Sequence, residues 1–149
     1  MNIQKYRFGD RVNLEVNLSN EALELRVPVF FLQLPVENAI KHGLEKTVHT
    51  VHICIYDTQE KNIFSVHIED DGQGITQERL DEIRSTLRGE KFVNSEEYKP
   101  KGLVNLNERI RQQFGTEYGV MIDHMPENGT QVVLTVPKGG QDAEGANSR

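Results

Sequence analysis

A short stretch of the chain combines a helical apolar pattern with polar side chains that could do chemistry. At about 100° per residue, Asn38, Lys41 and His42 fall on one side of a helix expected over residues 29–43. The amide oxygen of Asn38 suits a magnesium ion that keeps several waters and also holds substrate phosphates. Lys41 and His42 follow one turn later and could reach those phosphates. An ordinary amphipathic helix with a solvated polar side has the same pattern, so other stretches must decide.

A carboxylate at the end of an expected strand is the second candidate. Asp70 ends an alternating run whose apolar members should face the core: Phe64, Val66 and Ile68. A buried carboxylate needs a hydrogen-bonding partner. Thr130 opens another alternating run that faces the same interior, so its hydroxyl could support Asp70 directly or through a water.

Glycines beside these groups could let a ligand approach the backbone. Gly72 and Gly74 follow Asp70 directly, and glycine permits positive φ and close approach. Gly102 opens an expected helix, whose free amides and dipole favour an anion such as phosphate. Residues 90–101 before it are charged and aperiodic, which is typical of a lid over a site.

Length and composition limit the class of protein. The 149 residues fit one domain with a single core, and a net charge of −6 without a long basic cluster argues against a nucleic-acid partner. The longest apolar run, residues 27–36, is far shorter than the roughly 20 residues of a membrane span, and the N-terminus lacks the apolar core of a signal peptide. We therefore expect a soluble chain. The single Cys54 excludes an intrachain disulfide and fits a reducing cytoplasm.

Periodicity predicts the elements that must position the candidate groups. Alternation predicts strands over residues 11–18, 51–56, 63–70, 120–124 and 130–136, with hairpin loops at 57–62 and 126–129. Helical spacing predicts further helices over residues 76–89 and 102–115, and glycines should end all three helices, at Gly43, Gly89 and Gly115. Pro35 should kink the first helix. We expect one domain over residues 1–138 and a disordered tail over 139–149.

In this order, the segments resemble the ATP-binding catalytic domain of bacterial sensor histidine kinases, in the superfamily of gyrase, Hsp90 and MutL. The N box of that family is matched by residues 37–43, its glycine boxes by 70–75 and 102–103, and its final Gly-Thr by 129–130. The resemblance covers residues 3–137 and looks closest to the YesM and LytS type, on residues 4–11, 80–90 and 105–111. It implies a Bergerat-type α/β fold: a two-layer sandwich whose mixed, largely antiparallel sheet is covered on one face by helices.

The resemblance also implies roles for individual residues. Asn38 would ligate Mg²⁺ with Glu37 supporting it, and these two are the implied catalytic residues. Asp70 would accept a hydrogen bond from the adenine amino group of ATP, backed by Thr130. The other implied ATP contacts divide between the phosphate end, at Lys41, His42, Lys101, Gly102 and Leu103, and the adenine end, at Gly72, Gly74 and Ile75.

Two positions depart from the family pattern. The second glycine box usually reads Gly-x-Gly-Leu, whereas Pro100 stands here in place of the first glycine. That change bears on lid closure and on phosphate affinity. The N box usually has proline before leucine, whereas here Leu34 precedes Pro35, which moves the expected kink by one residue.

The function implied is that of a protein-histidine kinase fragment. The parent would be a homodimeric receptor in the bacterial cell membrane, with this domain in the cytoplasm. It would pass the γ-phosphoryl group of ATP to a histidine in an upstream dimerisation domain, and from there to a response regulator. None of the five histidines here has the context of that phosphoacceptor, so this chain alone should not autophosphorylate.

Two alternative functions stay open. One is a degenerate nucleotide-binding module that acts by protein contact, suggested by Pro100. The other is an ATP-gated clamp like gyrase or MutL. In those proteins a carboxylate one turn before the N-box asparagine activates water, and Leu34 occupies that position here.

Overall fold

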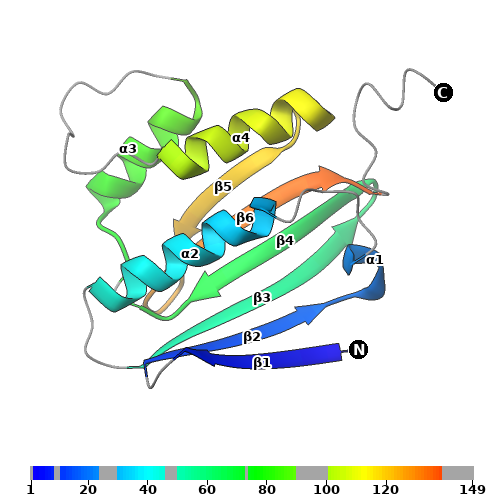
Figure 1. The fold of residues 1–149 in the computed structure, drawn as a ribbon. Helices are drawn as coiled ribbons and strands as arrows, with labels where there is room; N and C mark the ends of the chain where they lie inside the picture. Colours follow the sequence, from blue (N-terminus) through cyan, green and yellow to red (C-terminus); the bar gives the residue numbers. More distant parts are fainter. Residues whose placement is uncertain are drawn as a thin grey trace.

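The fold has two layers, a β-sheet and a set of helices that lie on one of its faces (Figure 1). The computed structural model describes residues 2–8, 11–23, 30–45, 50–72, 74–89 and 101–138. The strands are β1 (Asn2–Phe8), β2 (Val12–Leu18), β3 (Val51–Glu60), β4 (Ile63–Asp70), β5 (Gly119–His124) and β6 (Thr130–Pro137). The helices are α1 (Asn20–Leu23), α2 (Phe30–Glu45), α3 (Gln77–Leu87) and α4 (Lys101–Phe114).

These six strands form one mixed sheet in the order β1-β2-β3-β4-β6-β5. Among the described strands, only β2 and β3 pair in parallel, with Leu14 opposite Ile53, and the other four pairings are antiparallel. In the sequence, β2 and β3 are separated by α1 and α2, as a parallel pair requires a crossover connection. The expected two-layer sandwich with a mixed, largely antiparallel sheet is therefore confirmed.

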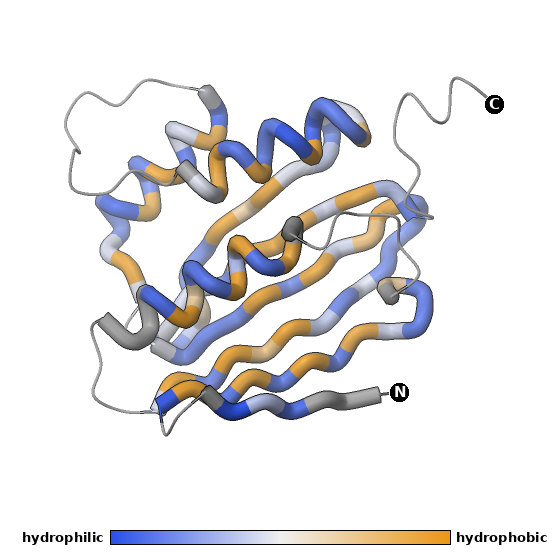
Figure 2. Tube along the Cα trace, viewed as in Figure 1, coloured by the Kyte–Doolittle hydropathy of each residue, from blue (hydrophilic) through white to orange (hydrophobic). Residues whose placement is uncertain are grey.

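The core lies between the sheet and the helices. Alternate side chains of the strands point to this interior, and Figure 2 shows the resulting alternation of apolar and polar residues along them. α2 packs on β3 and β4, while α4 packs on β5 and β6. Phe64, Ile68 and Ile110 are almost fully buried there. Among the described residues, no helix covers the opposite face of the sheet (Figure 1).

Two of the predicted helices begin and end as their sequence signals indicate. The Oγ1 atom of Thr76 accepts a hydrogen bond from the Arg79 amide at 3.1 Å and caps α3. Gly89 follows α3 with a φ of 86°, and Gly115 follows α4 with a φ of 126°. The stripe expected on α4 is buried: Leu103, Leu106, Ile110 and Phe114.

Several boundaries differ from the prediction. β3 continues to Glu60, so the loop expected over 57–62 shrinks to a turn at Lys61 and Asn62. The polar residues before that turn pair along β4 at the exposed end of the hairpin, where strand structure needs no apolar side chains. α2 continues to Glu45 through Gly43, which therefore does not end the helix. One glycine inside a helix costs only about 1 kcal/mol.

Other elements had no usable signal or lie outside the described residues. β1 was not predicted because its alternation is weak, as suits an edge strand whose Tyr6 is 47% exposed. Pro35 lies buried inside α2, and the kink there stays a prediction. Residues 90–100 of the candidate lid expected over 90–101, with Pro100 among them, and the tail at 139–149 lie outside the described residues, whereas Lys101 begins α4.

Candidate functional site

The candidate residues from distant parts of the sequence lie on elements that meet in the helical layer and at the strand ends beneath it. Asp70 ends β4, and Thr130 begins the neighbouring strand β6. Asn38 lies near the middle of α2, and Gly102 lies in the first turn of α4. α2 contacts both β4 and α4, so it connects the two groups of residues.

Asp70 is partly buried and its carboxylate is held by backbone amides. The Gly72 amide donates to Oδ1 at 2.9 Å, and the Thr130 amide also donates to this carboxylate. Burial raises the pKa of the Asp70 carboxyl, the two amides oppose that shift, and neighbouring Asp71 adds to it. The inward direction predicted for Asp70 is confirmed. The supporting group is the backbone amide of Thr130, where the sequence suggested its hydroxyl.

The turn after Asp70 packs tightly against the end of the β5–β6 hairpin. Gly129 has a φ of 111°, and a Cβ atom there would lie 1.8 Å from the carbonyl oxygen of Asp70. Gly74 has a φ of 81°, and a Cβ atom there would lie 3.2 Å from the Gly129 carbonyl oxygen. Both positions therefore need glycine, for conformation and for space. The hairpin end closes with a hydrogen bond of 3.1 Å from the Met125 amide to the Gly129 carbonyl.

At the other group, α2 and α4 touch through small and apolar atoms. A Cβ atom on Gly102 would lie 2.7 Å from Cδ2 of Leu34 and 3.9 Å from Nδ2 of Asn38. The partly buried Asn38 side chain therefore lies beside the first turn of α4, where backbone amides lack intrahelical acceptors. Leu103 is buried and anchors this turn in the core. The side-chain amide of Asn38 and an anion-attracting helix terminus are thus brought together, although they are far apart in the sequence.

Two of the remaining predicted residues on α2 and α4 are exposed, and the side chains of two others are not described. The Glu37 carboxylate is exposed and accepts a hydrogen bond from Nε2 of Gln33 at 2.9 Å, which directs it along the helix surface. Lys41 is also exposed. His42 and Lys101 belong to α2 and α4, but their side chains lie outside the described part of the structure.

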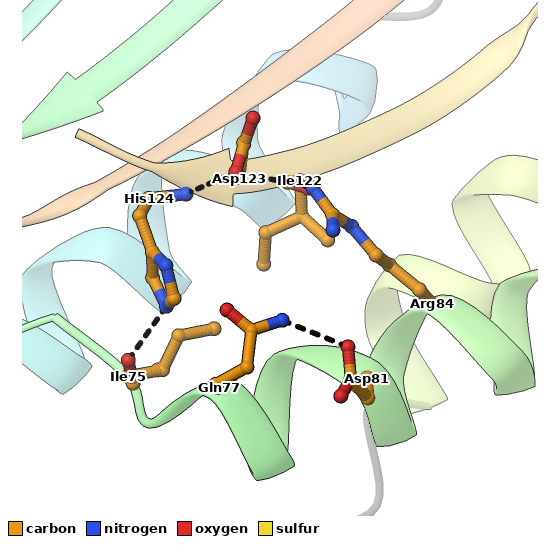
Figure 3. A network of polar contacts seen from close by, with 7 residues as sticks. All are labelled: Ile75, Gln77, Asp81, Arg84, Ile122, Asp123 and His124. Atoms are coloured by element: carbon orange, nitrogen blue, oxygen red, sulfur yellow. Dashed lines mark hydrogen bonds and ion pairs between the residues drawn. The ribbon is translucent and has the colours of Figure 1, made fainter. Parts of the chain in front are cut away.

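One contact to this region comes from a residue to which the sequence assigned no role. The ring of His124 forms a hydrogen bond of 2.8 Å from Nε2 to the carbonyl oxygen of Ile75, directly after the glycine turn (Figure 3). His124 ends β5 in the same phase as the buried Val120 and Ile122. This alternation was the only sequence signal that could have identified His124. It indicates a polar side chain that faces the interior at the end of a strand, as it did for Asp70.

The donor set near Asn38 fits a sparsely coordinated cation. Among the described residues, no group of three or more His, Cys, Asp or Glu side chains could hold a metal ion. Mg²⁺ commonly keeps several waters and takes its other ligands from one or two side chains and substrate phosphates. The single side-chain amide of Asn38, beside a helix N-terminus, fits that mode of binding, whereas a site made of protein ligands alone would need more donors. Within the described residues, none of the helices has the length and apolarity that a membrane crossing requires.

The amino-acid sequence matches proteins of one family along most of its length. Residues 32–140 match the family described as histidine kinase-, DNA gyrase B- and HSP90-like ATPases. The sensor protein LytS of Streptococcus mutans is 31% identical over 144 residues, which cover 95% of this chain and 24% of that protein. The sensor histidine kinase YesM of Bacillus subtilis is 31% identical over 137 residues, which cover 92% of this chain and 22% of that protein. The chain thus spans about a quarter of the length of these curated relatives.

Histidine kinases are among the solved structures with a similar fold. The catalytic domain of the histidine kinase ThkA aligns with a TM-score of 0.58 at 17% identity, covering 86% of this chain and 80% of that one. The mycobacterial sensor histidine kinase MprB aligns with a TM-score of 0.56 at 16% identity, covering 88% of this chain and 83% of that one. At these identities the likeness concerns the fold. With most of its length matched by the family, the chain belongs to the histidine kinase-, DNA gyrase B- and HSP90-like ATPases.

Proposed function

We propose that this chain is the ATP-binding catalytic domain of a two-component sensor histidine kinase, and that it binds ATP together with Mg²⁺. The observation that carries the proposal is the Asp70 carboxylate, which faces the interior at a strand end beside a glycine turn and is fixed there by two backbone amides. An ionised carboxylate has about four acceptor positions, more than these two amides occupy. A hydrogen-bond donor on a ligand could take up one of the remaining positions.

At this end of the site, the chemistry favours adenine. Adenine presents an amino group as a donor, whereas guanine presents a carbonyl oxygen at the same ring position. The Asp70 carboxylate would accept from the amino group and repel the carbonyl. Since a site built to hydrogen-bond one group rejects an analogue that lacks it, Asp70 would select ATP over GTP. Gly72, Gly74 and Ile75 would border the base, because they form the turn that follows Asp70.

At the other end, the residues suit phosphates. The first turn of α4, at Lys101, Gly102 and Leu103, would offer backbone amides to phosphate oxygens. Asn38 would be the protein ligand of Mg²⁺, and Lys41 and His42 would add positive charge and donors near the phosphates. Bound there, Mg²⁺ would neutralise phosphate charge. Glu37 would act by orienting groups around Asn38, although its carboxylate is bonded to Gln33 here.

The parent protein would extend well beyond this domain. It would be a homodimer in the bacterial cell membrane, with this domain on the cytoplasmic side. The γ-phosphoryl group would go to a histidine in an upstream dimerisation domain and then to a response regulator. An ATP-gated clamp would need a carboxylate at position 34 to activate water. Leu34 stands there and packs against Gly102, which favours transfer of the phosphoryl group to a histidine over hydrolysis.

Isothermal calorimetry with ATP and GTP, each with and without Mg²⁺, tests the proposal. The wild type should bind ATP more tightly with Mg²⁺ and should bind GTP weakly. Asp70→Asn should lose the preference for ATP, while Asp71→Asn, at the exposed neighbour, should keep it. Asn38→Ala should lose the strengthening by Mg²⁺, while Gln33→Ala on the exposed side of α2 should keep it.

The opposite results would assign a different function. Folded wild-type protein that binds neither nucleotide would favour the non-catalytic module that acts by protein contact. Retained ATP preference in Asp70→Asn would refute the role of this carboxylate, and an unchanged Mg²⁺ effect in Asn38→Ala would refute ligation by this amide.

A further inference from the structure

The end of the β5–β6 hairpin holds the glycine turn at two separate points. On one side of the turn, the Thr130 amide donates to the Asp70 carboxylate. On the other side, the His124 ring bonds the carbonyl oxygen of Ile75 at 2.8 Å. Gly129 lies between these two contacts and packs against the backbone of Asp70. The turn that would border the adenine base is therefore held from one hairpin at both of its ends.

The direction of the His124 hydrogen bond follows from its partner. A backbone carbonyl oxygen only accepts, so Nε2 of His124 must carry the proton and donate. Both the Nε2–H tautomer and the imidazolium can do this. Figure 3 shows the ring reaching from the end of β5 to the chain just before α3.

The strand that carries His124 is itself fixed to α3. Nε of Arg84 donates to the Ile122 carbonyl at 3.1 Å, and Nη2 of Arg84 pairs with Oδ1 of Asp123 at 3.1 Å. The His124 amide donates to the same Asp123 oxygen at 2.7 Å. Neighbouring residues thus hold the backbone of His124. The hydrogen bond from its ring fixes the Ile75 carbonyl relative to β5 (Figure 3).

We propose that His124 is a positioning residue for the adenine end of the site. By holding the Ile75 carbonyl, it positions Gly74 and Ile75 relative to Asp70, which the other end of the same hairpin holds. This inference rests on the proposed function, because it concerns the same nucleotide site. α2, which carries Asn38, packs on β3, β4 and α4, whereas His124 ends β5. The loss of His124 should therefore weaken the recognition of adenine and leave the effect of Mg²⁺ unchanged.

Two variants of His124 separate positioning from simple structural support. His124→Gln keeps an N–H donor at the place of Nε2, and His124→Phe keeps a planar ring without a donor. His52→Phe, at an exposed histidine on β3, serves as the control. Calorimetry with ATP and GTP, with and without Mg²⁺, is combined with thermal unfolding and with amide hydrogen exchange of Ile75 and Thr76 in nucleotide-free protein.

We expect His124→Phe to bind ATP roughly fivefold more weakly, the factor that corresponds to one net hydrogen bond. Its preference for ATP over GTP should fall, while the ratio of affinities with and without Mg²⁺ should stay that of the wild type. His124→Gln should bind within about twofold of the wild type, because it restores the donor. Amide exchange of Ile75 and Thr76 should be faster in His124→Phe alone.

Other outcomes would overturn the inference. Wild-type ATP affinity in His124→Phe would remove the role at the pocket, and equal losses in both variants with lower melting temperatures would make His124 a structural residue only. If the wild type itself binds no ATP, the proposed function fails, and the exchange experiment still decides the local question. Unchanged exchange in His124→Phe would then show that His124 does not position the turn.

Discussion

Asp70 carries two opposing requirements in one side chain. In the proposed role, the Asp70 side chain accepts a hydrogen bond best when it is ionised, but burial raises the pKa of this carboxyl above its ordinary value of 3.8. The amides of Gly72 and Thr130 oppose the shift without abolishing it. The folded state therefore keeps this proton to higher pH than the unfolded state does. Its contribution to stability is complete below pH 3.8 and is lost as the pH rises through the folded-state pKa.

Asp70→Asn should remove this pH dependence, because the amide does not titrate. We expect the melting temperature of the variant, minus that of the wild type, to increase as the pH is raised from about 3 to about 7. Thermal unfolding by circular dichroism across that range measures the difference. Asp81→Asn, at an exposed carboxylate on α3, serves as the control. A difference for Asp70→Asn that does not change with pH would contradict the raised pKa.

His67, on the sheet face away from the helices, is a second titrating residue with a defined environment. Its Nε2 bonds Oγ1 of Thr58 at 2.9 Å, and its Nδ1 lies 3.3 Å from Nε2 of Gln131. The ring stacks on Tyr56 with centroids 4.6 Å apart. Because the Gln131 amide nitrogen donates, this arrangement uses neutral His67 with the proton on Nε2. Burial lowers the pKa of His67 below its ordinary 6.5, and the negative charges of Glu69 and Asp57 partly oppose this by raising it.

The lowered pKa makes stability depend on pH in the opposite sense to Asp70. The unfolded state takes up the His67 proton first, so this contribution is present above pH 6.5 and is lost as the pH falls through the folded-state pKa. We expect the free energy of unfolding to fall less steeply between pH 7 and about 5 in His67→Gln than in the wild type. Urea unfolding at several pH values measures this. His52→Gln, at an exposed histidine, serves as the control. A slope in His67→Gln identical to that of the wild type would count against the neutral ring.

At the scale of elements, one buried side chain joins three of them. Asn107 on α4 is only 5% exposed, its Nδ2 donates to the Leu87 carbonyl at the end of α3, and its Oδ1 accepts from the Val120 amide of β5. The two bonds are 3.2 and 2.9 Å long. They satisfy backbone groups at a helix end and at the edge of the sheet, which would otherwise be left without partners.

Asn107→Ala should therefore destabilise the domain more than a surface change would. Leaving the Leu87 carbonyl and the Val120 amide without partners should lower the free energy of unfolding by about 2 kcal/mol. Asn105→Ala, at an exposed position on the same helix, should change it by less than about 0.5 kcal/mol. Urea denaturation of the three proteins tests the difference, and similar values for the two variants would show that the junction does not depend on Asn107.

At the scale of the whole molecule, the proposed function separates a nucleotide site in this chain from a phosphoryl acceptor outside it. Phosphoryl transfer relies on positioning and on charge neutralisation, so a domain without a positioned acceptor can bind ATP and not use it. MgATP at a concentration 100-fold above its dissociation constant should raise the free energy of unfolding of the chain by about 2.7 kcal/mol.

Incubation of this chain with γ-labelled ATP should therefore give no acid-labile label on histidine. The same assay with a full-length parent should label one histidine outside this chain. Mass spectrometry of the labelled peptides identifies the site. Stable labelling of His52, His67 or His124 in the isolated chain would contradict the proposed division between binding and acceptor domains.

Patterns that repeat over a few residues determined much of this protein from the sequence alone. Alternation located five of the six described strands, because successive side chains of a strand must face opposite sides of the sheet. The same alternation placed Asp70 on the inward face of its strand. Helical spacing and capping residues located α3 and α4 in the same way.

The tertiary structure alone decided which of these segments meet. The parallel pairing of β2 with β3, the approach of Asn38 to Gly102 and the bond from His124 to Ile75 join residues far apart in the chain. No local pattern records such contacts, since they depend on how whole faces pack together. α2 also continues beyond Gly43 to Glu45, since one glycine costs a helix only about 1 kcal/mol. Local periodicity sets the direction of each side chain, and only packing over the whole chain sets its neighbours.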